Sequence, residues 1–306
     1  TPSANKTYDG TALTAAGSIS GFVNNETATF TTTGTQTAAG SSTNSYTLTW
    51  DGTAKQSNYA VTENLGTLKV TENTNAIVIT ADSSSKTYDG SALTDSGYTY
   101  TGTLAAGDTL TAVVEGTQTD AGHSANTVTS YKVMRGTVDV TSSYTGITTV
   151  NGTLTVNKKA ATVASPSASK PYDGTALTDT AATQSGFVDG QGVTFDVTGS
   201  QTVAGTSDNA YTYAAKAGTD LDNYTITETV GTLTVTKATT PIVVTADSNS
   251  RDYDGTALVD DGYTYTDGVL AAGDTLSAVV TGMQTDAGSS ANAVTSYKVT
   301  NASGDD

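Results

Sequence analysis

The residues of this chain that could react with one another are lysines that recur at matching positions. Lys6, Lys86 and Lys170 occupy equivalent places in a repeated motif, and a lysine can form an amide with an asparagine side chain. Arg251 stands at the fourth equivalent place, and a guanidinium group cannot form this bond. We therefore expect no amide cross-link that all four places share.

A second cross-link chemistry would join a threonine to a glutamine as an ester. Glutamine followed by threonine recurs at Gln36–Thr37, Gln118–Thr119, Gln201–Thr202 and Gln284–Thr285. Neighbouring residues of a strand point to opposite faces, so the adjacent pair cannot bond to itself. We expect these glutamines to occupy polar positions of a strand or turn, and an ester with a distant threonine is the alternative.

The sequence offers few residues that could serve in catalysis or metal binding. His123 is the single histidine and there is no cysteine, so neither a catalytic triad nor a histidine or cysteine metal cluster can be assembled. Carboxylates that could bind calcium are Asp120, Asp220, Asp222, Asp260, Asp261 and Asp286, but EF-hand spacing is absent. We expect no enzyme and no cofactor, with a calcium ion at a junction between repeats as the one alternative to solvated turn carboxylates.

Two tyrosine pairs could bind a ligand. They are Tyr98 with Tyr100 and Tyr263 with Tyr265, and each pair alternates along a strand so that both rings face one side. Such rings either stack on sugars or line a core, and we expect the core. Exposure of Tyr98 and Tyr263 would favour ligand binding, whereas burial of both would weigh against it.

The single tryptophan, Trp50, belongs to the first repeat alone. Tyr213 stands at the counterpart position that the sequence suggests in the third repeat. We expect Trp50 to be a packing variant.

A Tyr-Asp-Gly core is the feature that recurs without change. It lies within KTYDGTALT, KTYDGSALT, KPYDGTALT and RDYDGTALV, at Tyr8-Asp9-Gly10, Tyr88-Asp89-Gly90, Tyr172-Asp173-Gly174 and Tyr253-Asp254-Gly255. Asp-Gly is a strong turn signal because glycine takes a positive φ without steric cost, and the aspartate can bond the turn backbone. The tyrosine can anchor the turn through its ring while its hydroxyl reaches a polar partner. A structural turn must recur in every repeat, so we expect this role rather than a catalytic pair.

The chain divides into four repeats of two kinds, arranged A-B-A-B. The second and fourth share GYTYT, LAAGDTL and VTSYKV, while the first and third share SGFV and NY. We predict domains at 1–73 (lacking an opening strand), 74–158, 159–238 and 239–306 (lacking a closing GTLTV strand). These ends suggest a section of a longer array in which an A-B pair was duplicated.

Strand and turn signals fill each repeat. Short β-branched runs such as IVIT at 77–80 alternate with Gly, Asn and Asp, and no stretch has the pattern of a long helix. We predict an all-β fold of small immunoglobulin-like sandwiches or β-grasp-like sheets. Because only a few residues connect one repeat to the next, we expect an elongated, stiff array.

Composition excludes two classes of partner. The formal charge is -17 over 306 residues, and this repels nucleic acid and anionic membrane surfaces. No run approaches the roughly 18 apolar residues of a membrane helix. We expect no nucleic-acid partner and no membrane insertion in this segment.

A resemblance follows from these motifs. The β-branched opening strand, K-x-Y-D-G-x-A-L, GxQTxAG and the closing GTLTV resemble the MBG and YDG repeat domains of large bacterial surface proteins, including adhesins. The resemblance implies an extracellular, cell-surface location, tandem stalks and, in some members, adhesion to mucus. It implies no catalytic residues.

The expected function is therefore a structural stalk or spacer that contacts neighbouring repeats or copies of itself. The alternative is a multivalent adhesion module that binds a host glycoprotein or glycan weakly at several places. The open last repeat also suggests that a strand from a neighbour could complete it and build a filament.

Overall fold

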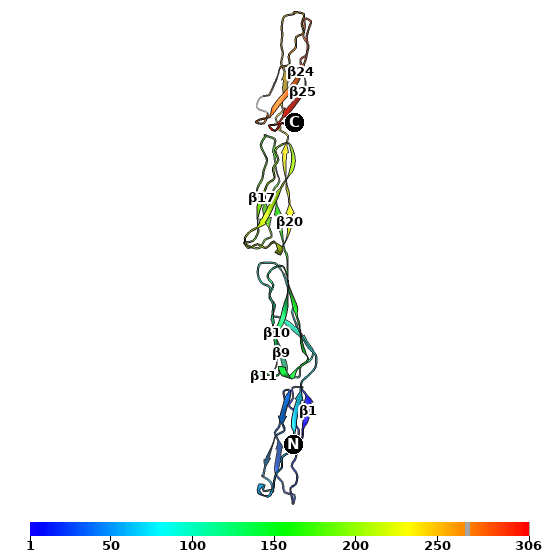
Figure 1. Ribbon diagram of the computed structural model, residues 1–306, viewed down its shortest axis with the longest axis vertical. Coiled ribbons are helices and arrows are strands. Elements are labelled where there is room, and N and C mark those ends of the chain that lie inside the picture. The colour runs from blue at the N-terminus through cyan, green and yellow to red at the C-terminus, as the bar shows by residue number, and fades with distance from the viewer. Residues whose placement is uncertain (267–269, 306) are drawn as a thin grey trace. The chain divides into compact units, whose positions relative to one another are not determined.

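The computed structural model describes residues 1–266 and 270–305, and these are almost entirely β (Figure 1). Strands and loops make up the described chain, with three short 3₁₀ turns and no α-helix among the described residues. The all-β prediction is confirmed. No helix within the described ranges is long and apolar enough to cross a membrane.

The chain forms two compact units, Thr1–Lys158 and Lys159–Asp306. The boundary between them coincides with the expected end of the first A-B pair, so each unit contains one A repeat and one B repeat. The finer division into four small domains, and the choice between a sandwich and a β-grasp-like sheet, stay predictions.

Unit 1 contains the elements of the first two repeats. The first repeat holds β1 (Ala4–Thr7), β2 (Thr29–Thr32), β3 (Gly40–Thr43), β4 (Tyr46–Thr49), η1 (Gln56–Asn58) and β5 (Thr67–Thr71). The second holds β6 (Ile77–Ala81), β7 (Ser84–Thr87), β8 (Tyr98–Thr101), β9 (Asp108–Glu115), β10 (Gly122–Arg135), β11 (Val138–Asp139), η2 (Thr141–Ser143), β12 (Ile147–Val150) and β13 (Gly152–Asn157).

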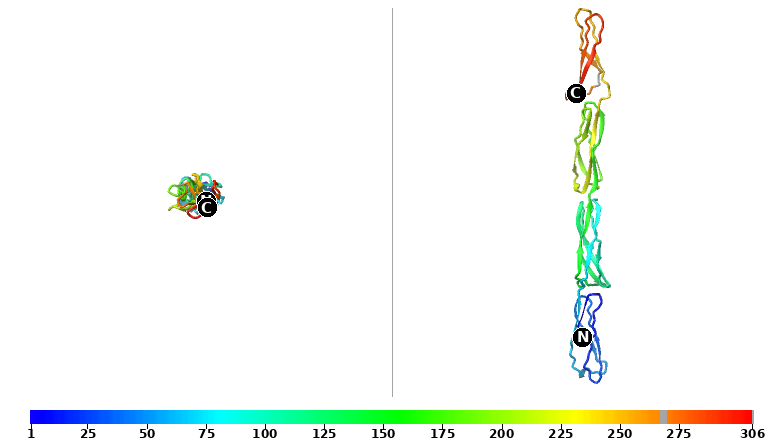
Figure 2. Two further views of the ribbon diagram at one scale, coloured as in Figure 1. Left: turned by 90° about the horizontal axis from the view of Figure 1, so that it is seen from above. Right: turned by 90° about the vertical axis from the view of Figure 1, so that its right-hand side faces the viewer.

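Unit 2 contains the elements of the last two repeats. The third repeat holds β14 (Lys159–Ala164), β15 (Ala168–Pro171), β16 (Thr183–Ser185), β17 (Val193–Val197), β18 (Gly205–Asn209), β19 (Tyr211–Ala215), η3 (Leu221–Asn223), β20 (Tyr224–Thr229) and β21 (Gly231–Thr236). The fourth holds β22 (Val244–Ala246), β23 (Tyr263–Tyr265), β24 (Thr275–Thr281) and β25 (Ala293–Thr300). The β24 and β25 strands form the orange and red hairpin of Figure 2.

One three-strand arrangement recurs in the first three repeats. A closing strand (β5, β13 or β21) lies between an entry strand that leads into the Tyr-Asp-Gly turn (β1, β7 or β15) and a return strand (β3, β10 or β18). The closing strand pairs in parallel with the entry strand and antiparallel with the return strand. The GTLTV segments that end the repeats in sequence are therefore central strands.

The composition of the closing strand follows from this central position. Its leucine and valine are buried, and the residues between them face outward because strand side chains alternate. Its glycine lies against backbone: a Cβ would come within 2.2 Å of the carbonyl oxygen of Pro2 at Gly66 and of Asp82 at Gly152, and within 2.1 Å of Pro166 at Gly231. Only glycine fits this place without moving the neighbouring chain.

A second three-strand sheet lies in both the second and the third repeat. In the second repeat β6 lies between β8, which is antiparallel to it, and β12, which is parallel to it. In the third repeat β14 lies in the same way between β16 and β20. The inward residues Ile77 and Ile79 of β6 are fully buried.

The strand register corrects the expected counterpart of Trp50. Phe30 pairs with Leu48 across β2 and β4, and Phe195 pairs with Tyr213 across β17 and β19. Tyr213 is thus equivalent to Leu48, two residues before Trp50. The expectation was wrong because aromatic character was matched in place of strand position.

Leu154, which is fully buried in β13, tests the importance of the closing strand. We expect Leu154→Ala to lower the free energy of unfolding of unit 1 by about 2–5 kcal/mol, because it removes core contacts and leaves a cavity. Urea unfolding followed by circular dichroism measures this loss. Val150→Ala, at a position 48% exposed in the neighbouring β12, is the control and should change little; equal losses for both variants would contradict the central role of β13.

Candidate functional site

The Tyr-Asp-Gly turns share one hydrogen-bond pattern. In the first, Asp9 Oδ1 accepts hydrogen bonds from the backbone N–H (2.8 Å) and the hydroxyl (2.8 Å) of Thr11. Lys6 Nζ donates to the same Asp9 oxygen at 2.7 Å and to the Thr11 carbonyl at 2.5 Å. Gly10 has a φ of 80°, which favours glycine. The corresponding aspartate contacts recur at Asp89, Asp173 and Asp254.

These contacts stabilise the ionised aspartates. The hydrogen bond from Lys6 is the largest cause that holds the pKa of Asp9 well below its usual range, and the backbone N–H of Thr256 is the largest cause that lowers the pKa of Asp254. A carboxyl whose pKa is lower in the folded state contributes stability above its unfolded pKa of about 4, and this contribution is lost as the pH falls toward the folded pKa. Because the pairs are exposed, they shape the turn more than they stabilise the fold.

The glutamines that suggested an ester take part in the same turn region. Gln36 and Leu13 exchange backbone hydrogen bonds of 2.8 and 3.1 Å. The Gln36 side-chain nitrogen donates to the carbonyl of Ala38 at 2.8 Å. Equivalent bonds form at Gln118, Gln201 and Gln284. Each glutamine therefore closes its own loop, as expected for a polar strand or turn position.

The tyrosine of the first turn binds a charged group in the second repeat. Tyr8 is 1% exposed, and its hydroxyl donates to Asp108 Oδ2 at 2.8 Å. The Tyr144 hydroxyl donates to the same oxygen at 2.7 Å. Arg135 Nη2 forms an ion pair of 2.7 Å with Asp108 Oδ1, and Arg135 Nε donates to the Tyr8 hydroxyl at 3.2 Å. The buried carboxylate is thus neutralised and hydrogen-bonded, as a buried charge requires.

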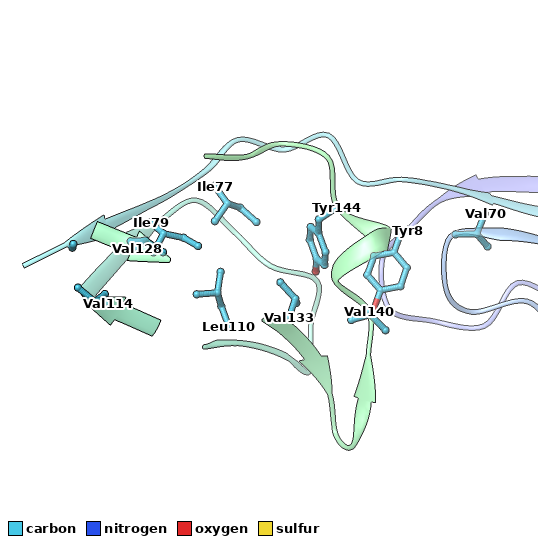
Figure 3. Packing of buried hydrophobic residues seen from close by; sticks show 11 residues of the cluster. Tyr8, Val70, Ile77, Ile79, Leu110, Val114, Val128, Val133, Val140 and Tyr144 are labelled. Carbon is cyan, nitrogen blue, oxygen red and sulfur yellow. The ribbon is translucent and has the colours of Figure 1, made fainter. Parts of the chain in front are cut away.

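The ring of Tyr8 also becomes part of the core of the second repeat. It packs edge-on against Tyr144, with 5.5 Å between the ring centroids, and the Arg135 guanidinium lies 5.9 Å from the Tyr8 ring centroid. Figure 3 shows Tyr8 beside Tyr144 and Val140 in one cluster of buried residues that continues through Val133. One hydrophobic cluster therefore spans the first and second repeats.

Burial also sets the protonation of the tyrosines. It is the largest cause that raises the pKa of both Tyr8 and Tyr144 above the ordinary value. Both hydroxyls therefore remain protonated and can donate to Asp108 across the physiological range. We call Asp108, Arg135 and Tyr144 the tyrosine socket.

Backbone contacts reinforce this junction. Asn73, just after β5, donates from its N–H to the carbonyl of Ser143 at 2.8 Å, and its side-chain nitrogen donates to the carbonyl of Tyr8 at 3.3 Å. The N–H of Ala39 donates to the hydroxyl of Ser143 at 2.9 Å. Side-chain and backbone bonds together fix the first repeat to the second.

Unit 2 repeats the junction without the arginine. The Tyr172 hydroxyl lies 3.0 and 2.9 Å from the two carboxylate oxygens of Asp274. Asn301 stands at the place that corresponds to Arg135 when the VTSYKV segments are aligned. A Cβ on Gly174 would come within 2.9 Å of the Ala271 side chain. The turn of the third repeat therefore lies close to the fourth repeat, as the first turn lies close to the second repeat.

A tyrosine that follows a 3₁₀ turn marks the same place in both A repeats. The Tyr59 hydroxyl donates to Glu26 at 2.7 Å and accepts from the N–H of Val23 at 3.2 Å. Tyr224 has the same relation to Gln191 and Val188. Neither the 3₁₀ turns nor the hydrogen bonds to Glu26 and Gln191 were expected from the sequence. The Asn-Tyr dipeptide that the two A repeats share was the one sequence signal for this place.

The remaining expected sites are not brought together into one site. Tyr98 and Tyr263 are half-buried, and their hydroxyls approach the carbonyls of Leu110 and Leu276 at 3.4 and 3.2 Å. Tyr98 packs against the hydrophobic cluster of the second repeat, and its core role and that of Tyr263 stay predictions. Their partners Tyr100 and Tyr265 are instead exposed, at 43% and 38%.

The calcium candidates do not converge. Asp220 caps the η3 turn by accepting from the N–H of Asp222, and Asp260 accepts from the N–H of Gly262. Across 1–266 and 270–305, no group of three or more histidines, cysteines or acidic residues is arranged to hold a metal ion. Asp220 and Asp260 therefore act as turn residues through these contacts.

No protein-family model matches the chain, and no curated protein sequence matches it.

The hydroxyl of Tyr8 tests the tyrosine socket. We expect Tyr8→Phe to lower the free energy of unfolding of unit 1 by about 1–3 kcal/mol, because Asp108 stays buried while it loses one hydrogen-bond donor. Calorimetry of the full chain measures the shift. Tyr253→Phe is the matched control, since Tyr253 occupies the same motif but is 68% exposed, and it should leave the transition unchanged. An unchanged unfolding transition in the Tyr8→Phe variant would contradict the contribution of the tyrosine socket to stability.

Proposed function

We propose that this chain is a structural stalk or spacer segment of a repetitive bacterial surface protein or fibre, and that it works outside the cell. The resemblance to MBG and YDG repeats supports the location. The parallel pairing of entry and closing strands is the observation that carries the mechanical role. The proposal assigns no catalytic role to the chain.

Parallel pairing determines how a repeat responds to tension. In the second repeat the chain enters through β6 and β7 and leaves through β13, and both β6 with β12 and β7 with β13 are parallel pairs. Pulling on the two ends of the repeat therefore slides these strands along each other. Sliding loads all hydrogen bonds of a pair together, whereas pulling an antiparallel hairpin apart from its open end breaks them one after another.

The Tyr-Asp-Gly turn connects the loaded strands to each other. The N–H of Tyr8 donates to the carbonyl of Thr71 at the end of β5, and Tyr88 and Tyr172 bond Asn157 and Thr236 in the same way, each at 2.8 Å. In the first repeat, tension in β5 therefore also acts on the turn whose tyrosine is held by Asp108. The invariant motif thus supports transmission of force from an A repeat to the following B repeat.

Pulling the second repeat in two directions tests this role. Because the chain has no cysteine, handles can be placed at Thr74→Cys with Lys158→Cys, or at Thr111→Cys with Lys132→Cys. The first pair slides the parallel strands, and the second peels β9 from β10, where Thr111 and Lys132 are register partners. We expect single-molecule unfolding at clearly higher force for the first pair. Equal forces in the two directions would contradict a stalk built on sliding resistance.

The second candidate function is adhesion, and the exposed Tyr100 and Tyr265 favour it. They lie at equivalent places in the two B repeats, so a weak glycan contact at each would gain from repetition. We expect the double variant Tyr100→Ala, Tyr265→Ala to bind immobilised mucin at least tenfold more weakly than the unaltered chain in surface plasmon resonance. Tyr297→Ala, at a position 70% exposed, is the control. Absence of mucin binding by the unaltered chain would remove this candidate.

A further inference from the structure

The second repeat contains a long strand with an open edge. The strand β9 spans eight residues, Asp108–Glu115, and pairs with β10 alone among the described strands (Figure 1). The closing strand of this repeat, β13, is in place and pairs with another part of β10. An open strand edge presents unpaired N–H and C=O groups that can bond another extended chain. We propose that β9 of one molecule pairs antiparallel with β9 of a second copy of this chain.

The strand β9 lacks the features that usually protect an edge. The other edge strands of the second repeat are β7, β8, β11 and β12, and each has only two to four residues. Between its two end residues β9 has neither a charged residue nor a proline. The bulge in its pairing with β10 lies on the β10 side, between Val128 and Ser130. Short length, charge, proline and bulges block edge-to-edge pairing in natural sheets, and the middle of β9 has none of them.

The backbone of Leu110 faces the open edge. Leu110 is the register partner of Val133 on β10. The Val133 N–H donates to the hydroxyl of Thr141 at 2.9 Å, and the Val133 carbonyl accepts from the N–H of Val140 at 2.9 Å. Both groups of Val133 therefore face away from β9, which makes Leu110 and Val133 a non-hydrogen-bonded pair. In such a pair the N–H and C=O of the second residue also face away from the shared side of the ladder.

Ala112 and Val114 share the direction of Leu110, because every second residue of a strand turns its N–H and C=O to the same side. The Tyr98 hydroxyl, which belongs to β8 and not to β10, approaches the Leu110 carbonyl at 3.4 Å. A carbonyl oxygen has two lone pairs, so this long contact leaves one free for a partner strand. Leu110, Ala112 and Val114 thus present a row of donors and acceptors at the open edge.

An antiparallel pair centred on Ala112 matches this row to itself. Ala112 then lies opposite Ala112 of the second copy, and Leu110 lies opposite Val114 in both halves of the pair. Each of these pairs can exchange two backbone hydrogen bonds, because all three residues face the edge.

The charges of the strand also allow this register. Asp108 is committed to the tyrosine socket, where its carboxylate is already neutralised and hydrogen-bonded. Glu115 would lie opposite Thr109 of the second copy, so no two like charges oppose each other. The exposed, uncharged and β-branched Thr111 and Val113 would lie opposite each other next to the centre. This match of the strand to itself favours a second copy as the occupant of the edge.

Cross-linking that depends on register tests the proposal on the full chain, which has no cysteine of its own. In the proposed pair Thr111 and Val113 of the two copies form a non-hydrogen-bonded pair with about 4.5 Å between their Cα atoms. This distance lies within the range of a disulfide. A mixture of Thr111→Cys chains and Val113→Cys chains should therefore form a disulfide dimer in a glutathione redox buffer. High salt is used because it screens the net charge of -17 on each copy.

The matched control is the Thr111→Cys chain without its partner variant. Its two cysteines would be diagonal neighbours with roughly 7–8 Å between them, beyond the usual disulfide range. It should cross-link at least tenfold more slowly than the mixture.

Amide hydrogen exchange gives a second measurement that needs no substitution. The amides of Thr109 and Thr111 face β10 and should exchange slowly at every protein concentration. The amides of Leu110, Ala112 and Val114 should exchange at least tenfold more slowly in concentrated than in dilute protein, because only the dimer bonds them.

Three results would overturn the proposal: a chain that sediments as a monomer at millimolar concentration, equal cross-linking of the mixture and the control, or exchange at the open edge that does not depend on concentration. This inference goes beyond the stalk proposal and fails separately from it. The pulling comparison uses single molecules, so its result does not depend on pairing between copies.

Discussion

The structure depends on the central position of the closing strand. In the first three repeats this strand supplies backbone partners to both neighbours and places its leucine and valine in the core. Its last carbonyl also binds the N–H of the turn tyrosine, as Thr71 binds Tyr8. The three-strand sheet of a repeat therefore depends on one short segment, whereas the Tyr-Asp-Gly turn also forms at Asp254 in the fourth repeat, whose described residues include no such strand.

The second constraint is the buried carboxylate at the junction between repeats. Asp108 has a fully buried side chain, and Tyr8, Tyr144 and Arg135 surround it with hydrogen bonds and an opposite charge. A buried charge is costly unless it is satisfied in this way, so the first repeat stabilises the second by supplying Tyr8. This dependence couples two repeats through one invariant residue. In unit 2 the same coupling uses Asp274 without an arginine.

Packing and strand order also explain why the invariant motif has two halves with different roles. Asp9 and Gly10 act within the turn, because the aspartate bonds Thr11 and the glycine takes a positive φ. Tyr8 acts beyond its repeat, in the core of the next one. A substitution at Gly10 would disturb both, since a Cβ there would meet the Arg135 guanidinium at 1.7 Å. The three residues are thus retained together for separate physical reasons.

The all-β class and the Asp-Gly turn could be read from the residues alone, because strand alternation and Asp-Gly chemistry are local signals. Burial of the turn tyrosine was expected because an aromatic before a turn tends to anchor it; it holds for Tyr8 and Tyr88 but is wrong for Tyr253, which is 68% exposed. The partners of Tyr8 could not be read in this way, because Asp108 and Tyr144 lie far from it in sequence and no local pattern links them. Register likewise decided that Tyr213 matches Leu48, because pairing across strands depends on contacts between distant segments.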